Sequence, residues 1–170
     1  MRFIGDDIKG NMVLFFLAAG GAFLSDWATK LWVTRRLDPG ERLELIPGVL
    51  ALEHVRNPGA AFGLFAGWRG GGALFLLASV LALGMAVFFL LARRNGSFPL
   101  RHYLLDLSVG AIAGGVLGNL RERISRGEVT DFLALPFWPV FNLADVFIVL
   151  GGAVLAFFLL RRDLHLSSAG

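Results

Sequence analysis

The chain has 170 residues, of which 56% are hydrophobic and 17% charged, and it contains no cysteine. This much apolar sequence is not typical of soluble domains and indicates an integral membrane protein. The absence of cysteine excludes disulfides, thiol nucleophiles and thiolate metal sites. The net charge of +3 includes arginine pairs at the ends of apolar runs, which favours contact with anionic membrane lipids. No basic stripe with interleaved aromatic residues indicates binding to nucleic acid.

Four apolar segments are each long enough to cross a bilayer, which takes about 20 residues. They lie at about 12–33, 71–92, 104–120 and 141–160. Residues 1–170 are therefore expected to form a single integral-membrane domain, an all-α fold with four transmembrane helices. The first segment is expected to remain uncleaved, because its apolar character continues to Val33 and three further spans follow.

The first segment carries two charged residues near its end, Asp26 and Lys30. Residues four apart lie on the same side of a helix, so these two side chains can pair. A structural ion pair that lowers the cost of both charges is the simplest interpretation.

The loop at about 34–70 is too long for a simple connector. Residues 49–56 partly alternate between apolar and polar, as in a strand, and the NPGAAFG sequence that follows at 57–63 is typical of a turn. We expect a small β-rich region lying on the membrane surface, with the Asn57 side-chain amide directed into a site.

The third segment contains Gly110, Gly114 and Gly118, a spacing of four that allows another helix backbone to approach closely. Asn119 and Arg123 follow, also four apart on one face. The arginine is suited to binding an anionic or carbonyl group, or alternatively to anchoring on lipid phosphate.

Two aspartates flank the start of the last segment: Asp131 in what is expected to be a loop, and Asp145 inside the apolar run. A carboxylate at the centre of a membrane helix costs roughly 2.5–3.5 kcal/mol, which suggests a function. With four spans, the end of the third segment and the start of the fourth lie at one membrane face. Two neighbouring carboxylates share a proton and can hydrolyse a peptide bond. A non-catalytic role in helix packing or ion movement remains equally open from the residues alone.

Other hydrolytic chemistry has little support in the sequence. The histidines (His54, His102 and His165) are scattered and form no zinc-binding motif, so no metal is expected. Ser25 and Lys30 are five residues apart, which places them on different helix faces and argues against a Ser/Lys dyad.

Five short motifs occur in a fixed order over nearly the whole chain. They are DWATK at 26–30, NPGAAFG at 57–63, GNLRER at 118–123, VTDF at 129–132 and FNLAD at 141–145. With these motifs on four spans, the chain resembles the bacterial lipoprotein signal peptidases, also called signal peptidase II. The resemblance departs at Glu122, where the family usually has Asp.

The resemblance implies an aspartic endopeptidase that removes signal peptides from prolipoproteins by cutting before a diacylglyceryl-modified cysteine, without a cofactor. It implies catalytic roles for Asp131 and Asp145. Substrate-binding roles fall to Asn57, Gly59, Asn119, Arg123 and Asn142, and supporting roles to Asp26, Lys30 and Glu122. A small proton-coupled carrier or a membrane assembly subunit, with non-catalytic aspartates, is the alternative.

The expected location is the bacterial cytoplasmic (inner) membrane, with both termini in the cytoplasm and the site at the outer face. Total Lys and Arg numbers on the two sides do not decide the orientation, but three of the nine residues at 93–101 are Arg, which favours cytoplasmic termini. The expected partners are prolipoproteins and membrane lipids, and nothing requires more than a monomer.

Overall fold

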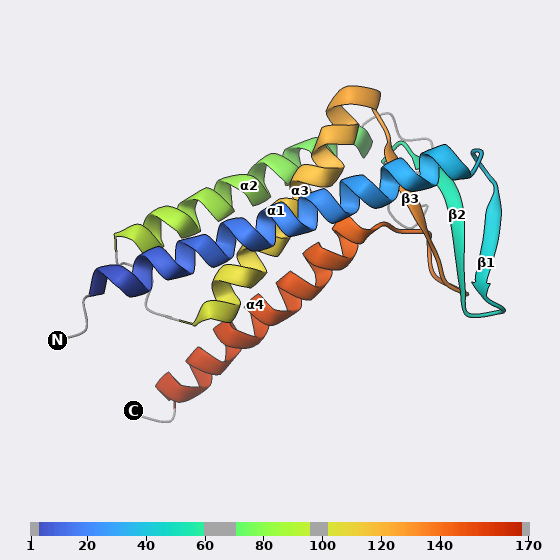
Figure 1. The fold of residues 1–170 in the computed structure, drawn as a ribbon. Coiled ribbons are helices and arrows are strands. Elements are labelled where there is room, and N and C mark those ends of the chain that lie inside the picture. The colour runs from blue at the N-terminus through green and yellow to red at the C-terminus, as the bar shows by residue number, and fades with distance from the viewer. Residues whose placement is uncertain (1–3, 60–70, 96–101, 168–170) are drawn as a thin grey trace.

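The computed structural model describes residues 4–59, 71–95 and 102–167. Within these residues the chain forms a bundle of long helices with a small sheet at one end (Figure 1). In chain order the elements are α1 (Ile4–Arg36), β1 (Arg42–Ile46), β2 (Leu50–Asn57), α2 (Gly71–Arg94), α3 (Tyr103–Arg126), β3 (Val129–Ala134) and α4 (Leu143–Ser167). The start of α1 and the end of α4 lie at the end of the bundle opposite to the sheet. The predicted fold class is confirmed.

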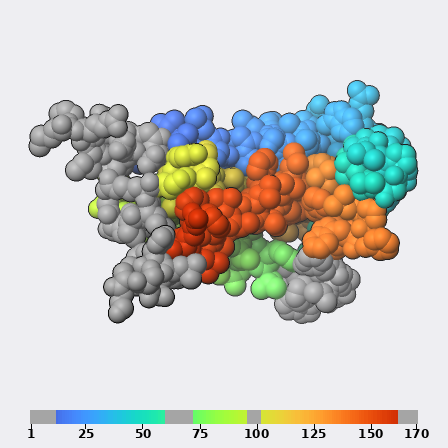
Figure 2. All heavy atoms as spheres, turned by 90° about the horizontal axis from the view of Figure 1, so that it is seen from below, coloured from blue at the N-terminus to red at the C-terminus, as the bar shows by residue number. Residues whose placement is uncertain are grey.

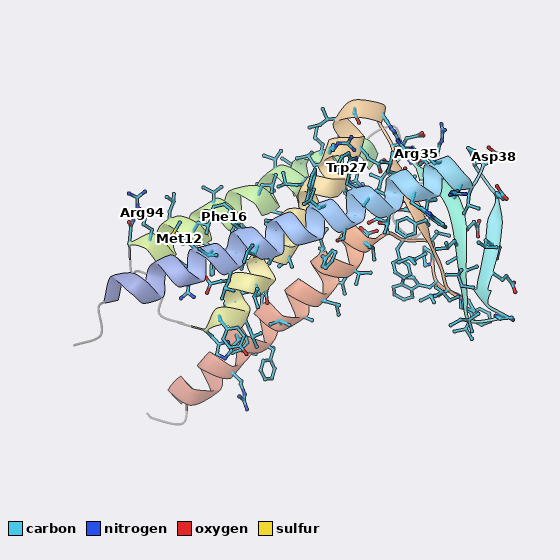
Figure 3. The ribbon with its side chains drawn as sticks, viewed as in Figure 1. Met12, Phe16, Trp27, Arg35, Asp38 and Arg94 are labelled. Carbon is cyan, nitrogen blue, oxygen red and sulfur yellow. The ribbon has the colours of Figure 1, made fainter. Side chains whose placement is uncertain are left out.

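Each of the four helices has a stretch of 19–25 residues that is long and apolar enough to span a membrane. At about 1.5 Å per residue these stretches cover the roughly 30 Å thickness of the hydrocarbon core. Figure 3 places Met12, Phe16 and Arg94 toward one end of the bundle and Arg35 and Asp38 beside the sheet. The chain is therefore a multi-pass membrane protein.

Helix α3 is the central helix of the bundle. Of its most apolar stretch 61% is buried, against 11–17% in the other three helices, whose side chains largely face outward. Figure 2 shows α4 lying across one face of the molecule, with α1 along one side of it and α2 along the other. The residues that project from α3 therefore reach three neighbouring helices.

Glycines on two sides of α3 allow this close packing. A Cβ atom at Gly114 would overlap the carbonyl oxygen of Ala19 on α1, and one at Gly115 would lie 2.6 Å from the carbonyl oxygen of Ala144 on α4. Backbones approach this closely only where side chains are absent. The packing role predicted for the small residues of this helix is confirmed, and it extends to α4 as well as α1.

The strands form an antiparallel sheet in the order β1-β2-β3. Strand β2 occupies the part of the 34–70 loop where strand-like alternation was seen, and residues 60–70 of that loop lie outside the described residues. Strand β3 was not expected, and the prediction that Asp131 lies in a loop is wrong. Asp131 pairs in register with Val55 of β2. Because β3 is buried along nearly its whole length, it lacks the alternation by which exposed strands are recognised.

An apolar cluster between the sheet and the end of α1 packs the sheet against the helix bundle. Val33 and Leu37 at the end of α1 pack with Leu52 of β2 and Phe132 of β3. Phe132 directly follows Asp131, so this cluster ties the backbone of β3 to the membrane helices.

Candidate active site

Six polar residues from four elements line one pocket with a volume of about 430 Å³. They come from the end of β2, the last half of α3, the middle of β3 and the start of α4: Asn57, Asn119, Arg123, Asp131, Asn142 and Asp145. All six were predicted as site residues from the sequence. Helix α3 continues six residues beyond its expected end at 120, so Arg123 projects from a helix that is itself buried in the bundle.

The residues that join β3 to α4 bring Asn142 next to Asp131. Phe141 pairs with Leu133: its N–H donates to the Leu133 carbonyl at 3.0 Å, and its carbonyl accepts from the Leu133 N–H at 2.7 Å. The chain therefore folds back along β3 immediately before α4 begins. Asn142 Nδ2 then donates to Asp131 Oδ1 at 2.6 Å.

Asn142 and Asp145 form a reciprocal cap at the start of α4. The Asp145 N–H donates to Asn142 Oδ1 at 3.0 Å, and the Asn142 N–H donates to Asp145 Oδ2 at 3.2 Å. This is the capping-box arrangement, in which the side chains of the N-cap and N3 residues satisfy backbone donors that the helix itself leaves unpaired. The position of Asp145 is thus set by the helix end on which it lies.

Asp26 stabilises the same helix end from α1. Its Oδ1 accepts from the Ala144 N–H at 2.9 Å, and its Oδ2 lies 2.8 Å from Lys30 Nζ. Both side chains are buried, so the predicted ion pair is confirmed, and it has a second contact that the spacing did not reveal. A carboxylate at a helix N-terminus interacts favourably with the positive end of the helix dipole.

Asn119 connects this ion pair to the pocket. Its Oδ1 accepts from Lys30 Nζ at 2.7 Å and from Asn142 Nδ2 at 3.1 Å, while its Nδ2 donates to Asp145 Oδ1 at 2.9 Å. The positive charge of Lys30 fixes which end of the amide faces Asp145, because the ammonium group only donates. The Asp145 side chain therefore receives hydrogen bonds on both oxygens.

Asp131 is 3% exposed and accepts from two side-chain amides. Asn57 Nδ2 donates to its Oδ2 at 2.8 Å, and Asn142 Nδ2 donates to its Oδ1. Burial, together with the charge of Asp145, raises the pKa of Asp131 from 3.8 to about 6, although the two amides and Lys30 act in the opposite direction. This carboxyl group is thus tuned to exchange a proton near neutral pH.

Gly59 does not line the pocket. Its N–H donates to Asn57 Oδ1 at 2.9 Å, which leaves the Asn57 Nδ2 group directed at Asp131. Gly59 has φ +114°, a conformation that favours glycine. The structure thus shows an orienting contact of Gly59 with Asn57, and its substrate-binding role stays a prediction.

Arg123 lies at the edge of the polar part of the pocket. Its guanidinium group lies 4.7 Å from the centre of the Phe75 ring of α2, and the negative charges of Asp145 and Asp131 attract it. Arg123 Nε is buried and has no hydrogen-bond partner among the described residues. The arrangement leaves a donor beside both carboxylates that can bind a carbonyl oxygen.

The rest of the pocket is apolar. Val146, Val149 and Leu150 of α4 and Phe75 of α2 line it, and Val149 and Leu150 are 67% and 61% exposed on the outer surface of the helix. The pocket therefore extends from the two carboxylates toward the surface that faces lipid. Among the residues that the structure describes, no group of three His, Asp or Glu side chains is arranged to hold a metal ion.

Among the residues near the site that were not predicted as site residues, Phe75 and Thr130 contact predicted ones. Phe75 lies in an apolar segment with no local signal that distinguishes it from lipid-facing neighbours. Thr130 precedes Asp131 and contacts Glu122 of α3; its place in the VTDF motif was the only available signal. Phe75 contacts Arg123, which is distant in sequence, and Thr130 contacts Glu122, eight residues earlier on another element; composition and spacing reveal neither contact.

Comparison with known proteins gives one consistent result. The family model for signal peptidase (SPase) II matches residues 18–161. The lipoprotein signal peptidase of Gloeobacter violaceus is 42% identical over 151 residues, which cover 88% of this chain and 83% of the relative. That of Pelotomaculum thermopropionicum is 40% identical over 151 residues and covers 88% and 93%.

A solved structure of a bacterial membrane enzyme, determined at 1.9 Å resolution, has a similar fold. It superimposes with a TM-score of 0.73 at 26% identity, over 94% of this chain and 95% of that one. The similarity to this structure therefore extends over nearly the whole chain.

Proposed function

Because the chain belongs to the signal peptidase II family, we propose that it removes signal peptides from prolipoproteins by an aspartic mechanism in which Asp131 and Asp145 are catalytic. One observation carries the mechanism: the two carboxylates line the same pocket, and Asn142 lies between them with bonds to both residues. An aspartic peptidase needs two carboxylates that share a proton and reach one peptide bond.

In the proposed reaction one carboxyl group is ionised and the other protonated. The ionised group takes a proton from a water molecule, whose oxygen attacks the scissile carbonyl carbon. The protonated group donates a hydrogen bond to the carbonyl oxygen, which carries negative charge as the tetrahedral intermediate forms. A proton then passes to the leaving amine and the C–N bond breaks. The pair titrates as a unit, so the two roles are not assigned to individual residues.

The asparagines hold this pair in place. Asn57 and Asn142 each donate to Asp131, and Asn119 donates to Asp145, so both carboxylates are oriented before substrate arrives. The bonds from neutral amides also stabilise the ionised form and offset part of the cost of burial.

Arg123 is suited to hold the substrate backbone. Its guanidinium group is kept beside the carboxylates by the Phe75 ring, and its Nε is directed at no acceptor among the described residues. A peptide carbonyl in the pocket provides such an acceptor.

The apolar part of the pocket fits the lipid-modified substrate. Val146, Val149 and Leu150 continue from the carboxylates to the lipid-facing surface of α4. A cysteine that bears diacylglycerol keeps its acyl chains in the bilayer while the preceding peptide bond lies at the carboxylates. We propose that cleavage occurs at that bond, before the lipidated cysteine.

The geometry supports an assignment of the membrane faces. The pocket lies at the end of the bundle next to the sheet, and the start of α1 and the end of α4 lie at the opposite end. With the arginine-rich 93–101 connection and both termini in the cytoplasm, the site faces outward from the cytoplasmic membrane.

Cleavage of a diacylglyceryl-modified peptide by the purified protein tests the proposal. The variants Asp131→Asn and Asp145→Asn keep the size of each side chain and remove the ability to exchange a proton. Loss of cleavage in both supports the dyad, and retained cleavage in either contradicts it.

A further inference from the structure

Glu122 of α3 holds Thr130, the residue that directly precedes Asp131 on β3. The Thr130 N–H donates to Glu122 Oε2 at 2.8 Å, and the Thr130 hydroxyl donates to Glu122 Oε1 at 3.1 Å. Glu122 is 3% exposed and Thr130 is 4% exposed. One carboxylate thus receives both the main-chain and the side-chain donor of a single residue.

Glu122 is a buried carboxylate, and its hydrogen bonds offset part of the free-energy cost of burying the charge. Lys30 Nζ lies 3.6 Å from its Oε2, and Arg126 Nη1 lies 3.4 Å from its Oε1. Hydrogen bonds to a buried carboxylate are roughly twice as strong as bonds between neutral groups, and an unsatisfied buried oxygen is costly. Moving Thr130 away would leave both oxygens with only the more distant cations.

A short turn makes α3 and β3 a single unit. Helix α3 ends at Arg126, and the N–H of its C-cap Gly127 donates to the Arg123 carbonyl at 3.0 Å; β3 begins at Val129. Glu122 therefore holds the first residues of β3 from the side of the helix, while β2 holds them through strand pairing, with Arg56 opposite Thr130. Asp131 comes next along a backbone that is fixed from two directions.

From this geometry we infer that Thr130 is a positioning residue for Asp131: through its hydroxyl and N–H bonds to Glu122 it sets the distance of the Asp131 carboxyl group from Asn119, Arg123 and Asp145. The inference rests on the proposed catalytic role of Asp131. A displacement of about 1 Å of a reacting group can cost on the order of 100-fold in rate. Loss of the Thr130 hydroxyl bond to Glu122 should therefore lower kcat more than it weakens substrate binding.

The test is a set of variants of the full chain, assayed with the diacylglyceryl-modified peptide. Thr130→Val removes the hydroxyl at nearly constant size. We expect kcat to fall about tenfold and KM to change less than about twofold, because the pocket walls that bind substrate remain. Thr130→Ser keeps the hydroxyl and should restore most of kcat. Thr130→Ala provides a second hydroxyl-free variant if the Val variant fails to insert.

Thr34→Val is the matched control. The Thr34 hydroxyl bonds only its own helix among the described residues, to the Lys30 and Leu31 carbonyls at 2.9 and 3.2 Å, and Thr34 lies outside the pocket. Its kcat should remain at the wild-type value.

Two results would overturn the inference. Full kcat in Thr130→Val or Thr130→Ala removes the positioning role, and so does a loss that Thr130→Ser fails to rescue, since packing then explains the effect. Asp131→Asn in the same assay separates these outcomes from failure of the proposed function. If Asp131→Asn is inactive while the hydroxyl-free variants are fully active, only the role of Thr130 is wrong; if Asp131→Asn is active, the aspartic mechanism itself is wrong.

Discussion

Asn142 and Asp145 each satisfy the backbone N–H of the other, at 3.0 and 3.2 Å, where α4 begins. A carboxylate proposed to act in catalysis is thereby also part of a helix cap. The same Asn142 side chain donates to Asp131 and to Asn119, so one residue links the helix end, both carboxylates and the support from α1. The helix cap uses the side-chain oxygen of Asn142, whereas the bonds to Asp131 and Asn119 use its amide nitrogen. A substitution that keeps the oxygen and removes the nitrogen therefore separates the two roles.

Asn142→Ser should keep the helix cap and reduce activity strongly. Serine is about as good an N-cap as asparagine, so the fall in melting temperature in detergent should reflect only the lost amide bonds to Asp131 and Asn119 and should be smaller than that of Asn142→Ala, which also loses the cap. Serine lacks the amide that donates to Asp131 and Asn119, so kcat/KM should fall on the order of 100-fold. Asn95→Ser, at an exposed position after α2, is the control. An active Asn142→Ser variant would show that capping alone accounts for this asparagine.

The stability of the wild type should depend on the protonation of Asp131. Burial raises its folded-state pKa to about 6 from 3.8, so the protonated form is favoured by folding. The contribution to stability is fully present below the unfolded value and is lost as the pH rises through 6, about 3 kcal/mol in total for a shift of roughly two pKa units. Asp131→Asn does not titrate and lacks this loss.

The measurement is the melting temperature of both proteins between pH 4 and pH 8. The variant minus wild-type difference should become more positive by several degrees as the pH rises. Only this change with pH is predicted, since the amide also alters the bonds with Asn57 and Asn142. A difference that stays constant, or that changes in the opposite direction, would contradict the raised pKa.

The contact between α3 and α1 should tolerate no side chain at Gly114. A Cβ there would overlap the Ala19 carbonyl oxygen, so Gly114→Ala should destabilise by about 1–3 kcal/mol despite the better helix propensity of alanine. Gly152→Ala on α4 is the matched control, because a Cβ at Gly152 meets nothing within 4 Å. Thermal unfolding of the two variants in one detergent compares them directly. Equal melting temperatures of the Gly114→Ala and Gly152→Ala variants would contradict this prediction, because α1 and α3 would then accommodate the added methyl group without loss of stability.

Features that depend on local sequence were predictable. The four spans follow from apolar composition, the Asp26–Lys30 pair from a spacing of four, and the shared face of Asn119 and Arg123 from the same spacing. These are properties of one helix, for which periodicity is sufficient. The pocket residues from different elements were identified as a group by topology and by the family motifs.

Features that depend on contacts between different elements were not predictable. Strand β3 is buried along nearly its whole length and lacks alternation, so Asp131 was assigned to a loop. The α3 helix was expected to end near 120, yet it continues to Arg126, and within this extension Glu122 is buried against Thr130 of β3 and Lys30 of α1. The effect of a glutamate at position 122 also required the structure, which shows its two oxygens bound to Thr130.

The most direct test of the account is cleavage of a diacylglyceryl-modified prolipoprotein peptide by the wild type, Asp131→Asn and Asp145→Asn. Asp38→Asn is the matched control, since Asp38 is exposed beyond the end of α1 and outside the pocket. The account predicts that both dyad variants insert into the membrane and lose cleavage by about 1,000-fold or more, while the control keeps wild-type activity. Cleavage near the wild-type rate by either Asp131→Asn or Asp145→Asn would contradict it.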